Sequence, residues 1–301
     1  MPSSFACRLA LLFLMSIPLT GCAPPAATGR PHVVTTVGML GDLVRQVAGD
    51  DVDWTGLMGP GVDPHLYKPK ESAIRKMFAA DRICYLGLHL EGKMDRVLSK
   101  SHQARAAGRG LPPELLLDDD GEHDPHVWFD VSLWAMVLDQ VADDLVELLP
   151  HRESVLRERA DRYRQELLAL HAEVKRDLAA IPKERRVMVT AHDAFRYFGR
   201  AYDLEVVGLQ GVSTANQAGL RKVQEVVDLV VSRRVKALFL ESSLPPDGVE
   251  AVLARCHSRS HPVNIASEEL YSDALGPPDS PAGSYVGMVR HNVRVIVDAL
   301  R

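Results

Sequence analysis

Residues 151–181, HRESVLRERADRYRQELLALHAEVKRDLAAI, form the longest stretch of helical periodicity in this 301-residue chain. Apolar residues recur there at steps of three and four with charged residues between them, as in an amphipathic helix. They are Leu156, Ala160, Tyr163, Leu167, Leu170, Val174, Leu178 and Ile181. The predicted helix spans roughly 45 Å at 1.5 Å per residue, longer than one small domain. Such a helix can pair as a coiled coil, but its place in mid-chain favours a rigid connection between two halves.

On both sides of this segment, strand patterns alternate with helix patterns. The predicted strands are 32–37, 52–58, 82–86, 186–190, 204–209, 235–240 and 263–266. The predicted helices are 39–48, 71–80, 92–107, 131–149, 191–201, 217–233, 249–257 and 283–300. This alternation indicates βαβ units and parallel sheets. We therefore predict an α/β fold of two lobes, each a mainly parallel sheet flanked by helices, joined by one long α-helix. The predicted boundaries are 31–150 for the first lobe, 151–182 for the linker helix and 183–301 for the second lobe.

The N-terminus has the pattern of an export signal. A short leader with one positive charge precedes the apolar run Leu9–Leu19, which is too short to span a bilayer as a mature helix. The run ends in Leu19-Thr20-Gly21-Cys22, which resembles the lipobox of bacterial lipoproteins. We expect a signal peptide at 1–21, a lipid on Cys22 and a flexible Pro/Ala tether at 22–30. The alternative is an ordinary secretory signal with a chance cysteine. Both signals predict export, and the lipobox further predicts a lipid anchor in a bacterial membrane, in the periplasm or on the cell surface.

Composition excludes some classes of protein. A hydrophobic content of 46% and a charged content of 25% are ordinary for a globular chain. The net charge of -5 argues against nucleic-acid binding, which normally shows a basic stripe. Beyond the leader, Cys84 and Cys256 lie in different halves and in apolar settings, so buried free thiols are expected rather than a disulfide.

The sequence Asp-Pro-His-apolar-aromatic occurs twice, at 63–67 and 124–128. Proline fixes its own φ and restricts the preceding Asp, so each His stands on a rigid loop and not on a helix face. One such loop alone would be read as a surface histidine. Two identical presentations of His65 and His126 indicate a shared ligand, and a transition metal is the commonest ligand of neutral imidazole.

The second half offers two further candidate ligands. His192 follows a predicted strand, and Asp273 lies in a turn after the last one, where ligands bind in open α/β sheets. Alone, His192 could equally be a hydrogen-bonded structural residue, and Asp273 is weaker still. With His65 and His126 they give a His3Asp set suited to Zn²⁺ or Mn²⁺.

A set of four protein ligands favours binding over catalysis. A catalytic zinc usually keeps an open position for water. The sequence also lacks His-Glu-x-x-His and a Gly-x4-Gly-Lys-Ser/Thr phosphate loop. We therefore expect capture of a metal for uptake and no enzymatic activity. A secreted zinc metallohydrolase and a surface adhesin are the alternatives.

Several motifs resemble those of the TroA-like metal-binding lipoproteins of ABC transporters, over essentially the whole mature chain. They are the two Asp-Pro-His copies, 191–195 (AHDAF), 208–214 (GLQGVST), 241–243 (ESS), 271–276 (YSDALG) and 285–289 (YVGMV). The resemblance implies two α/β lobes on a helical backbone, with the metal between them held by His65, His126, His192 and Asp273. It also implies a monomer that passes the metal to a membrane permease powered by a separate ATPase.

The resemblance leaves the metal open. His192 fits the three-histidine branch, whereas members with Glu at that place tend to be manganese proteins. Dedicated zinc members often carry a long His-rich loop before the second motif, but here the loop is short and acidic, with His123 alone. That loop is either a solvated turn or an attractor of cations toward His126. The bound metal is left open among zinc, manganese and iron. Glu241 is either a carboxylate that orients a ligand imidazole or a structural one. The other histidines are expected to be surface or packing residues: His32, His89, His102, His151, His171, His257, His261 and His291.

Overall fold

The computed structural model describes residues 29–119 and 121–301. The predicted signal peptide, Cys22 and most of the predicted tether lie outside the described residues. Residues 31–301 form one compact unit. Among the described residues, no helix combines the length and apolar character needed to cross a membrane.

The first sheet is a four-stranded parallel sheet with the order β2-β1-β3-β4. Its strands are β1 His32–Thr35, β2 Asp53–Gly56, β3 Arg82–Tyr85 and β4 Ala104–Ala106. The helices of this half are α1 Gly38–Ala48, α2 Glu71–Phe78, α3 Asp95–Leu98 and α4 Val131–Leu148. An antiparallel pair, β5 Asp118–Asp119 and β6 Glu122–His123, precedes α4.

The second sheet is also parallel, with the order β10-β9-β7-β8. Its strands are β7 Val187–His192, β8 Glu205–Gln210, β9 Ala237–Leu238 and β10 Asn264–Ile265. Its helices are α6 Arg196–Tyr202, α7 Leu220–Ser232, α8 Asp247–Ser258 and α9 Tyr285–Leu300. Every residue of β7 is buried, as expected for a central parallel strand covered on both faces.

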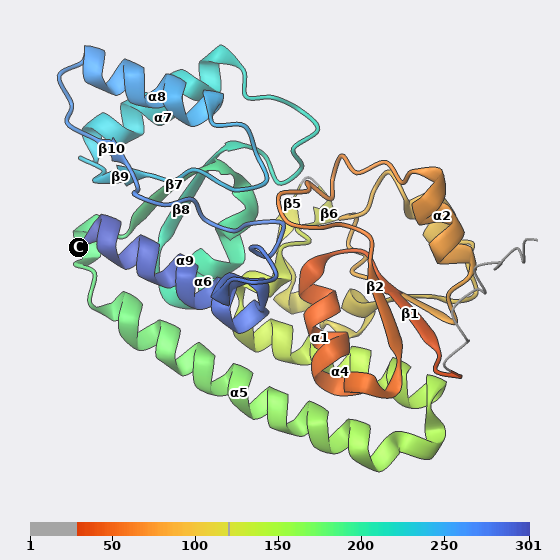
Figure 1. Ribbon diagram of the computed structural model, residues 1–301. Coiled ribbons are helices and arrows are strands. Elements are labelled where there is room, and N and C mark those ends of the chain that lie inside the picture. Colours follow the sequence, from red (N-terminus) through yellow and green to blue (C-terminus); the bar gives the residue numbers. More distant parts are fainter. Residues whose placement is uncertain (1–28, 120) are drawn as a thin grey trace, which may run out of the picture. The chain divides into compact units, whose positions relative to one another are not determined.

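One long helix, α5 Glu153–Ala179, runs alongside both halves (Figure 1). It packs against α1 and α4 of the first half and against α6 and α9 of the second. Its buried residues are those that the periodicity predicts: Leu156, Ala160, Tyr163, Leu167, Leu170, Val174 and Leu178. The Tyr163 hydroxyl donates a 2.6 Å hydrogen bond to the buried carboxylate of Asp42 in α1. The predicted fold class, two parallel sheets with flanking helices and one long helix, is confirmed.

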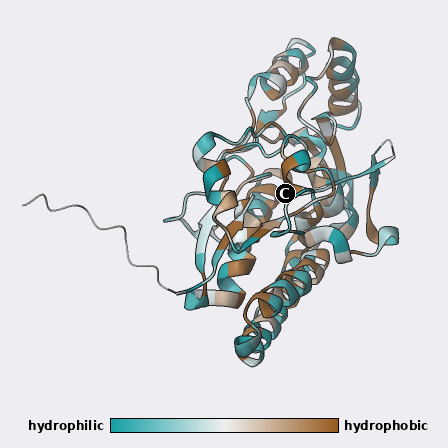
Figure 2. Cartoon of the chain, turned by 90° about the vertical axis from the view of Figure 1, so that its right-hand side faces the viewer, coloured by the Kyte–Doolittle hydropathy of each residue, from teal (hydrophilic) through white to brown (hydrophobic). Residues whose placement is uncertain are grey.

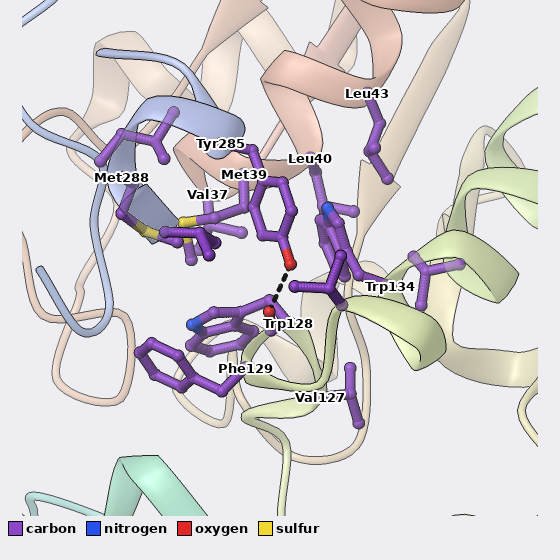
Figure 3. Packing of buried hydrophobic residues seen from close by; sticks show 14 of the residues in the cluster. Val37, Met39, Leu40, Leu43, Val127, Trp128, Phe129, Trp134, Tyr285 and Met288 are labelled. Carbon is purple, nitrogen blue, oxygen red and sulfur yellow. Dashed lines mark hydrogen bonds between the residues drawn. The ribbon is translucent and has the colours of Figure 1, made fainter. Parts of the chain in front are cut away.

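The hydrophobic core is continuous between the two halves. One cluster of buried residues extends from Val33 in β1 through α4 and α5 to Leu300 in α9. A second cluster lies between the second sheet and helices α7 and α8. Figure 3 shows part of the first cluster, where Trp128 and Trp134 pack near Tyr285 of α9. In Figure 2, apolar and polar residues are interspersed along the helices, as amphipathic packing requires.

The predicted helix at 92–107 is wrong. The structure has one helical turn, α3, and then places Ala104–Ala106 as the edge strand β4 beside β3. Pairing with β3 overrides the local helical preference of this segment, since strand formation depends on its neighbours. The remaining predicted elements are present, with ends that differ by a few residues. Short 3-10 turns complete the chain at 49–51, 107–110, 113–115, 127–129, 150–152, 183–185, 193–195 and 281–283.

Candidate metal centre

The topology of the second sheet brings His192 and Glu241 together. In the order β10-β9-β7-β8, β8 lies on one side of β7, and β9 and β10 lie on the other side. The strand order therefore reverses between β7 and β9. Ligands of open α/β sheets bind at such a point. His192 is the last residue of β7, and Glu241 follows β9. The backbone N–H of His192 donates to Oε1 of Glu241 at 2.9 Å.

Asp273 is placed by the extended segment after β10. Leu270 bridges in parallel to Glu241, and its carbonyl accepts a hydrogen bond from the Ser242 N–H at 2.9 Å. The side chain of Asn292 in α9 is buried and makes two hydrogen bonds with the backbone of Tyr271. Its Oδ1 accepts from the Tyr271 N–H, and its Nδ2 donates to the Tyr271 carbonyl. Asp273, two residues further on, is therefore carried on a fixed stretch of backbone.

The two Asp-Pro-His loops share one local geometry. Oδ1 of Asp63 accepts the backbone N–H of His65 at 2.8 Å, and Oδ1 of Asp124 accepts the backbone N–H of His126 at 3.0 Å. A side chain that accepts from the backbone two residues on closes a tight turn, as Asp commonly does. The repeated motif therefore builds the same turn twice.

The four predicted ligands converge. One possible ligand atom from each of His65, His126, His192 and Asp273 lies within 4.8 Å of all the others, and all four side chains are buried. The Nε2 atoms of His65 and His126 are 3.3 Å apart, and the carboxylate oxygens of Asp273 lie 3.4 Å from Nε2 of His126 and from Nε2 of His192. Ligands about 2.0–2.1 Å from a tetrahedral metal are separated by about 3.3–3.4 Å, so these spacings fit a Zn²⁺-like ion.

Two further carboxylates fix which ring nitrogens face the group. Oδ1 of Asp124 lies 2.8 Å from Nδ1 of His126, and Oε2 of Glu241 lies 2.6 Å from Nδ1 of His192. A proton held at Nδ1 leaves the lone pair of Nε2 free for a metal, which is how carboxylates commonly orient ligand imidazoles. Both oxygens of Asp273 are buried and accept no hydrogen bond from the described residues. Unpaired carboxylate oxygens at this depth are costly unless a cation compensates them.

The electrostatics divide the histidines into two kinds. Burial lowers the pKa of His65 to about 4, so its imidazole is neutral at physiological pH. Burial would also lower the pKa of His126 and His192, but the carboxylates of Asp124, Glu241 and Asp273 outweigh it and raise both, that of His192 strongly. Against its own burial, the pKa of Asp273 is held well below its usual range by His192 and His126. In the metal-free protein the carboxylates therefore favour the protonated rings of His126 and His192, whereas burial favours the neutral ring of His65.

The other histidines named from the sequence lie elsewhere. His123 is on the exposed β5–β6 hairpin and is not in the group. His32, His171, His257, His261 and His291 contact a side chain or backbone carbonyl outside it.

Sequence reasoning missed several residues that position the group. They are Arg196, 3.5 Å from Asp124; Asn292; Trp128, which hydrogen-bonds the Ser272 carbonyl; and Thr214, which hydrogen-bonds Asp63. Trp128 belongs to the second Asp-Pro-His motif and Thr214 to the motif at 208–214, but neither motif indicates the partner, because each of these residues acts on one remote in sequence.

Comparison with known proteins gives one family over nearly the whole chain. The family model described as zinc-uptake complex component A, periplasmic, matches residues 33–299. The zinc-binding protein TroA of Treponema pallidum is 46% identical over 98% of this chain and 97% of its own length. The manganese-binding lipoprotein MntA of Bacillus subtilis is 39% identical over 97% of this chain and 98% of its own.

Solved structures agree with the sequence comparison. The structure of periplasmic zinc-binding TroA from Treponema pallidum superimposes with a TM-score of 0.88, covering 90% of this chain and 99% of that one at 46% identity. The Fe(III)-bound YtgA of Chlamydia trachomatis has a TM-score of 0.84 at 26% identity, with 90% of this chain and 98% of that chain covered. These relatives bind different metals on one fold.

Proposed function

Because the chain belongs to the family of the periplasmic zinc-uptake complex component A, we propose that it captures a transition-metal ion outside the cytoplasmic membrane and delivers it to an ABC permease. The ion is Zn²⁺ or Mn²⁺, as in the relatives TroA and MntA. The observation that supports this most is the convergence of three imidazoles and one carboxylate, all buried, within 4.8 Å of one another.

We assign the four ligand roles to His65, His126, His192 and Asp273. Asp124 and Glu241 act on the Nδ1 atoms and hold the rings in place. Two observations fit an ion with four ligands, three of them nitrogen atoms. The ligand atoms are 3.3–3.4 Å apart, and the low pKa of His65 keeps its imidazole neutral. Mn²⁺ prefers more oxygen ligands, so the donor set favours Zn²⁺.

The same geometry supports transport over catalysis. Four protein ligands leave no open position for a reacting water, and the ligand side chains are at most 7% exposed. The chain thus serves as a carrier and not as a metallohydrolase. Its partners are a permease and a separate ATPase, and it works as a monomer held to the membrane through Cys22. The lobes are 31–150 and 183–301, on either side of the linker 151–182.

Calorimetric titration of metal-stripped protein tests this proposal. Zn²⁺ should bind with a stoichiometry of one and tighter than Mn²⁺, whereas Ca²⁺ and Mg²⁺, which require oxygen ligands, should not bind. His126→Ala should lose most of the affinity. His151→Ala, at a histidine in the turn before α5, is the matched control and should bind as the unaltered chain does. Equal binding by His126→Ala and the unaltered chain overturns the ligand assignment.

A further inference from the structure

The two Asp-Pro-His loops use their aspartates differently. In the second loop, one oxygen of Asp124 makes both contacts with His126. Its Oδ1 accepts from the backbone N–H of His126 and lies 2.8 Å from Nδ1 of the His126 ring. Asp63 closes the same turn with Oδ1, but its second oxygen, Oδ2, accepts a 2.6 Å hydrogen bond from the hydroxyl of Thr214. Thr214 lies 151 residues further along, in the connection between β8 and α7.

The loop that carries His126 is fastened to the second half by buried side chains. The Tyr197 hydroxyl donates to the Asp124 carbonyl at 2.9 Å, and the Trp128 indole donates to the Ser272 carbonyl at 3.0 Å. The Tyr285 hydroxyl donates to the Trp128 carbonyl at 2.6 Å (Figure 3). These bonds join the His126 loop to the Asp273 segment, and the bond from the His192 N–H to Glu241, whose backbone bridges to Leu270, joins His192 to that segment. The three side chains of His126, His192 and Asp273 are 0–1% exposed.

The loop that carries His65 lies at the outer side of the group. His65 is 7% exposed, more than the other three ligands, and the next residue, Leu66, is 46% exposed. Two contacts of this loop with the second half lie outside the group of four side chains. Thr214 bonds to Asp63, and Gly61, with a φ of +70°, lies so near Ser242 that a Cβ there would stand 3.4 Å from the Ser242 carbonyl oxygen. Of the four side chains, that of His65 is therefore the one nearest to solvent.

We propose that the Thr214–Asp63 hydrogen bond is a latch that holds the His65 loop closed over the metal and sets the rate of metal release. Thr214 is a positioning residue, since it contacts Asp63 and not the ligand atoms. Thr214 is only 6% exposed, so water competes poorly for the bond. The proposal rests on the metal-carrier function, and it identifies the His65 loop as the segment that opens to release the metal.

The test uses the mature chain with Thr214→Val, which removes the hydroxyl and keeps the shape, and Thr214→Ser, which keeps the hydroxyl. Ser213→Ala is the matched control, because the exposed Ser213 hydroxyl accepts only a long 3.4 Å bond from the Ala215 N–H. Zn²⁺ dissociation into excess chelator is followed by stopped flow. Thr214→Val should release Zn²⁺ about tenfold faster, the size expected for one hydrogen bond to a carboxylate. Thr214→Ser and Ser213→Ala should stay near the unaltered rate, and the stoichiometry should remain one.

A second measurement separates a latch from a merely structural contact. Thr214→Val should lower the melting temperature of the zinc-loaded protein more than that of the metal-free protein, because the latch acts with the ion. An equal loss in both forms, or a dissociation rate like that of the unaltered chain, overturns the proposal.

Hydrogen exchange distinguishes failure of the latch from failure of the carrier function. If the unaltered chain binds neither Zn²⁺ nor Mn²⁺, the carrier function fails. The latch then still predicts faster exchange of the His65 backbone amide in Thr214→Val than in Ser213→Ala. Unchanged exchange at that amide overturns the latch whatever the metal result.

Discussion

The indole Nε1–H of Trp128 donates a 3.0 Å hydrogen bond to the backbone carbonyl of Ser272, 144 residues away. Trp128 stands two residues after the proposed ligand His126, and Ser272 stands one residue before the proposed ligand Asp273. One buried bond therefore fixes the distance between ligand segments from the two halves. Such long-range bonds determine how the four side chains of the proposed metal site are arranged, because none of the four is near another in sequence.

Trp128→Phe removes this bond and leaves a buried carbonyl unpaired, which costs about 1–3 kcal/mol of folding free energy. It also removes volume, and Trp134→Phe controls for that. Trp134 is equally buried, but its Nε1 has no hydrogen-bond partner among the described residues. In urea unfolding, Trp128→Phe should be less stable than Trp134→Phe and should also bind Zn²⁺ more weakly. Equal effects of the two substitutions on zinc affinity would contradict the positioning role.

Glu241→Gln should weaken zinc binding about 10–100-fold, the usual effect of removing a carboxylate that orients a ligand histidine. The amide oxygen can still accept the His192 backbone N–H, so the fold of the β7 end is kept. What is lost is the negative charge 2.6 Å from Nδ1 of His192. Competition titration against a zinc chelator measures the change. Glu250→Gln, at an exposed position on α8, is the control and should leave the affinity unchanged.

Metal binding should release about two protons at pH 6.0. The raised pKa values of His126 and His192 keep both rings protonated there in the metal-free protein, whereas His65, with a pKa of about 4, is already neutral. Since the ligand form is the neutral imidazole, zinc affinity falls as pH falls through the raised pKa values, and this dependence begins above pH 6.5. Below that, each pH unit should lower affinity about 100-fold until His65 also titrates.

Calorimetry in two buffers of different ionisation enthalpy counts the protons directly. The charges explain the number: Asp124, Glu241 and Asp273 are balanced by Arg196 and two imidazoliums, and one divalent ion replaces the two protons. Binding enthalpies that do not depend on the buffer would contradict this exchange.

Much of the fold was predictable because its signals are local. The periodic strand and helix patterns lie within short continuous segments of the chain, and the buried face of α5 follows from its apolar spacing alone. The convergence of the four proposed ligands was predictable because two of them repeat one motif and two follow strands. The short strand β4 was not, since only its pairing with β3 makes it a strand. Asn292 and Thr214 were also out of reach, because an ordinary polar residue acquires its role from a partner that the fold brings to it.

Metal loading should change the radius of gyration by less than scattering can resolve. Helix α5 packs against helices of both halves, and the main core is continuous from β1 to α9. The buried Tyr163–Asp42 bond further ties α5 to α1. A swing of one half against the other would break this packing, so opening is confined to loops such as that of His65. Solution scattering with and without Zn²⁺ measures it, and a large change in radius would show that the linker helix bends.

Leu167→Ala in α5 should destabilise the protein by about 2–5 kcal/mol, since removal of a fully buried Leu side chain loses its burial and leaves a cavity. Leu167 is 0% exposed, whereas its neighbour Leu168 is 44% exposed on the same helix. Leu168→Ala is therefore a control with the same chemical change and nearly the same helix propensity, and it should shift stability by less than about 1 kcal/mol. Urea unfolding of both variants in metal-free form measures the difference without any contribution from metal binding. Because α5 contacts both halves, the Leu167→Ala transition should shift as one step; separate transitions for the two halves would mean that they fold independently.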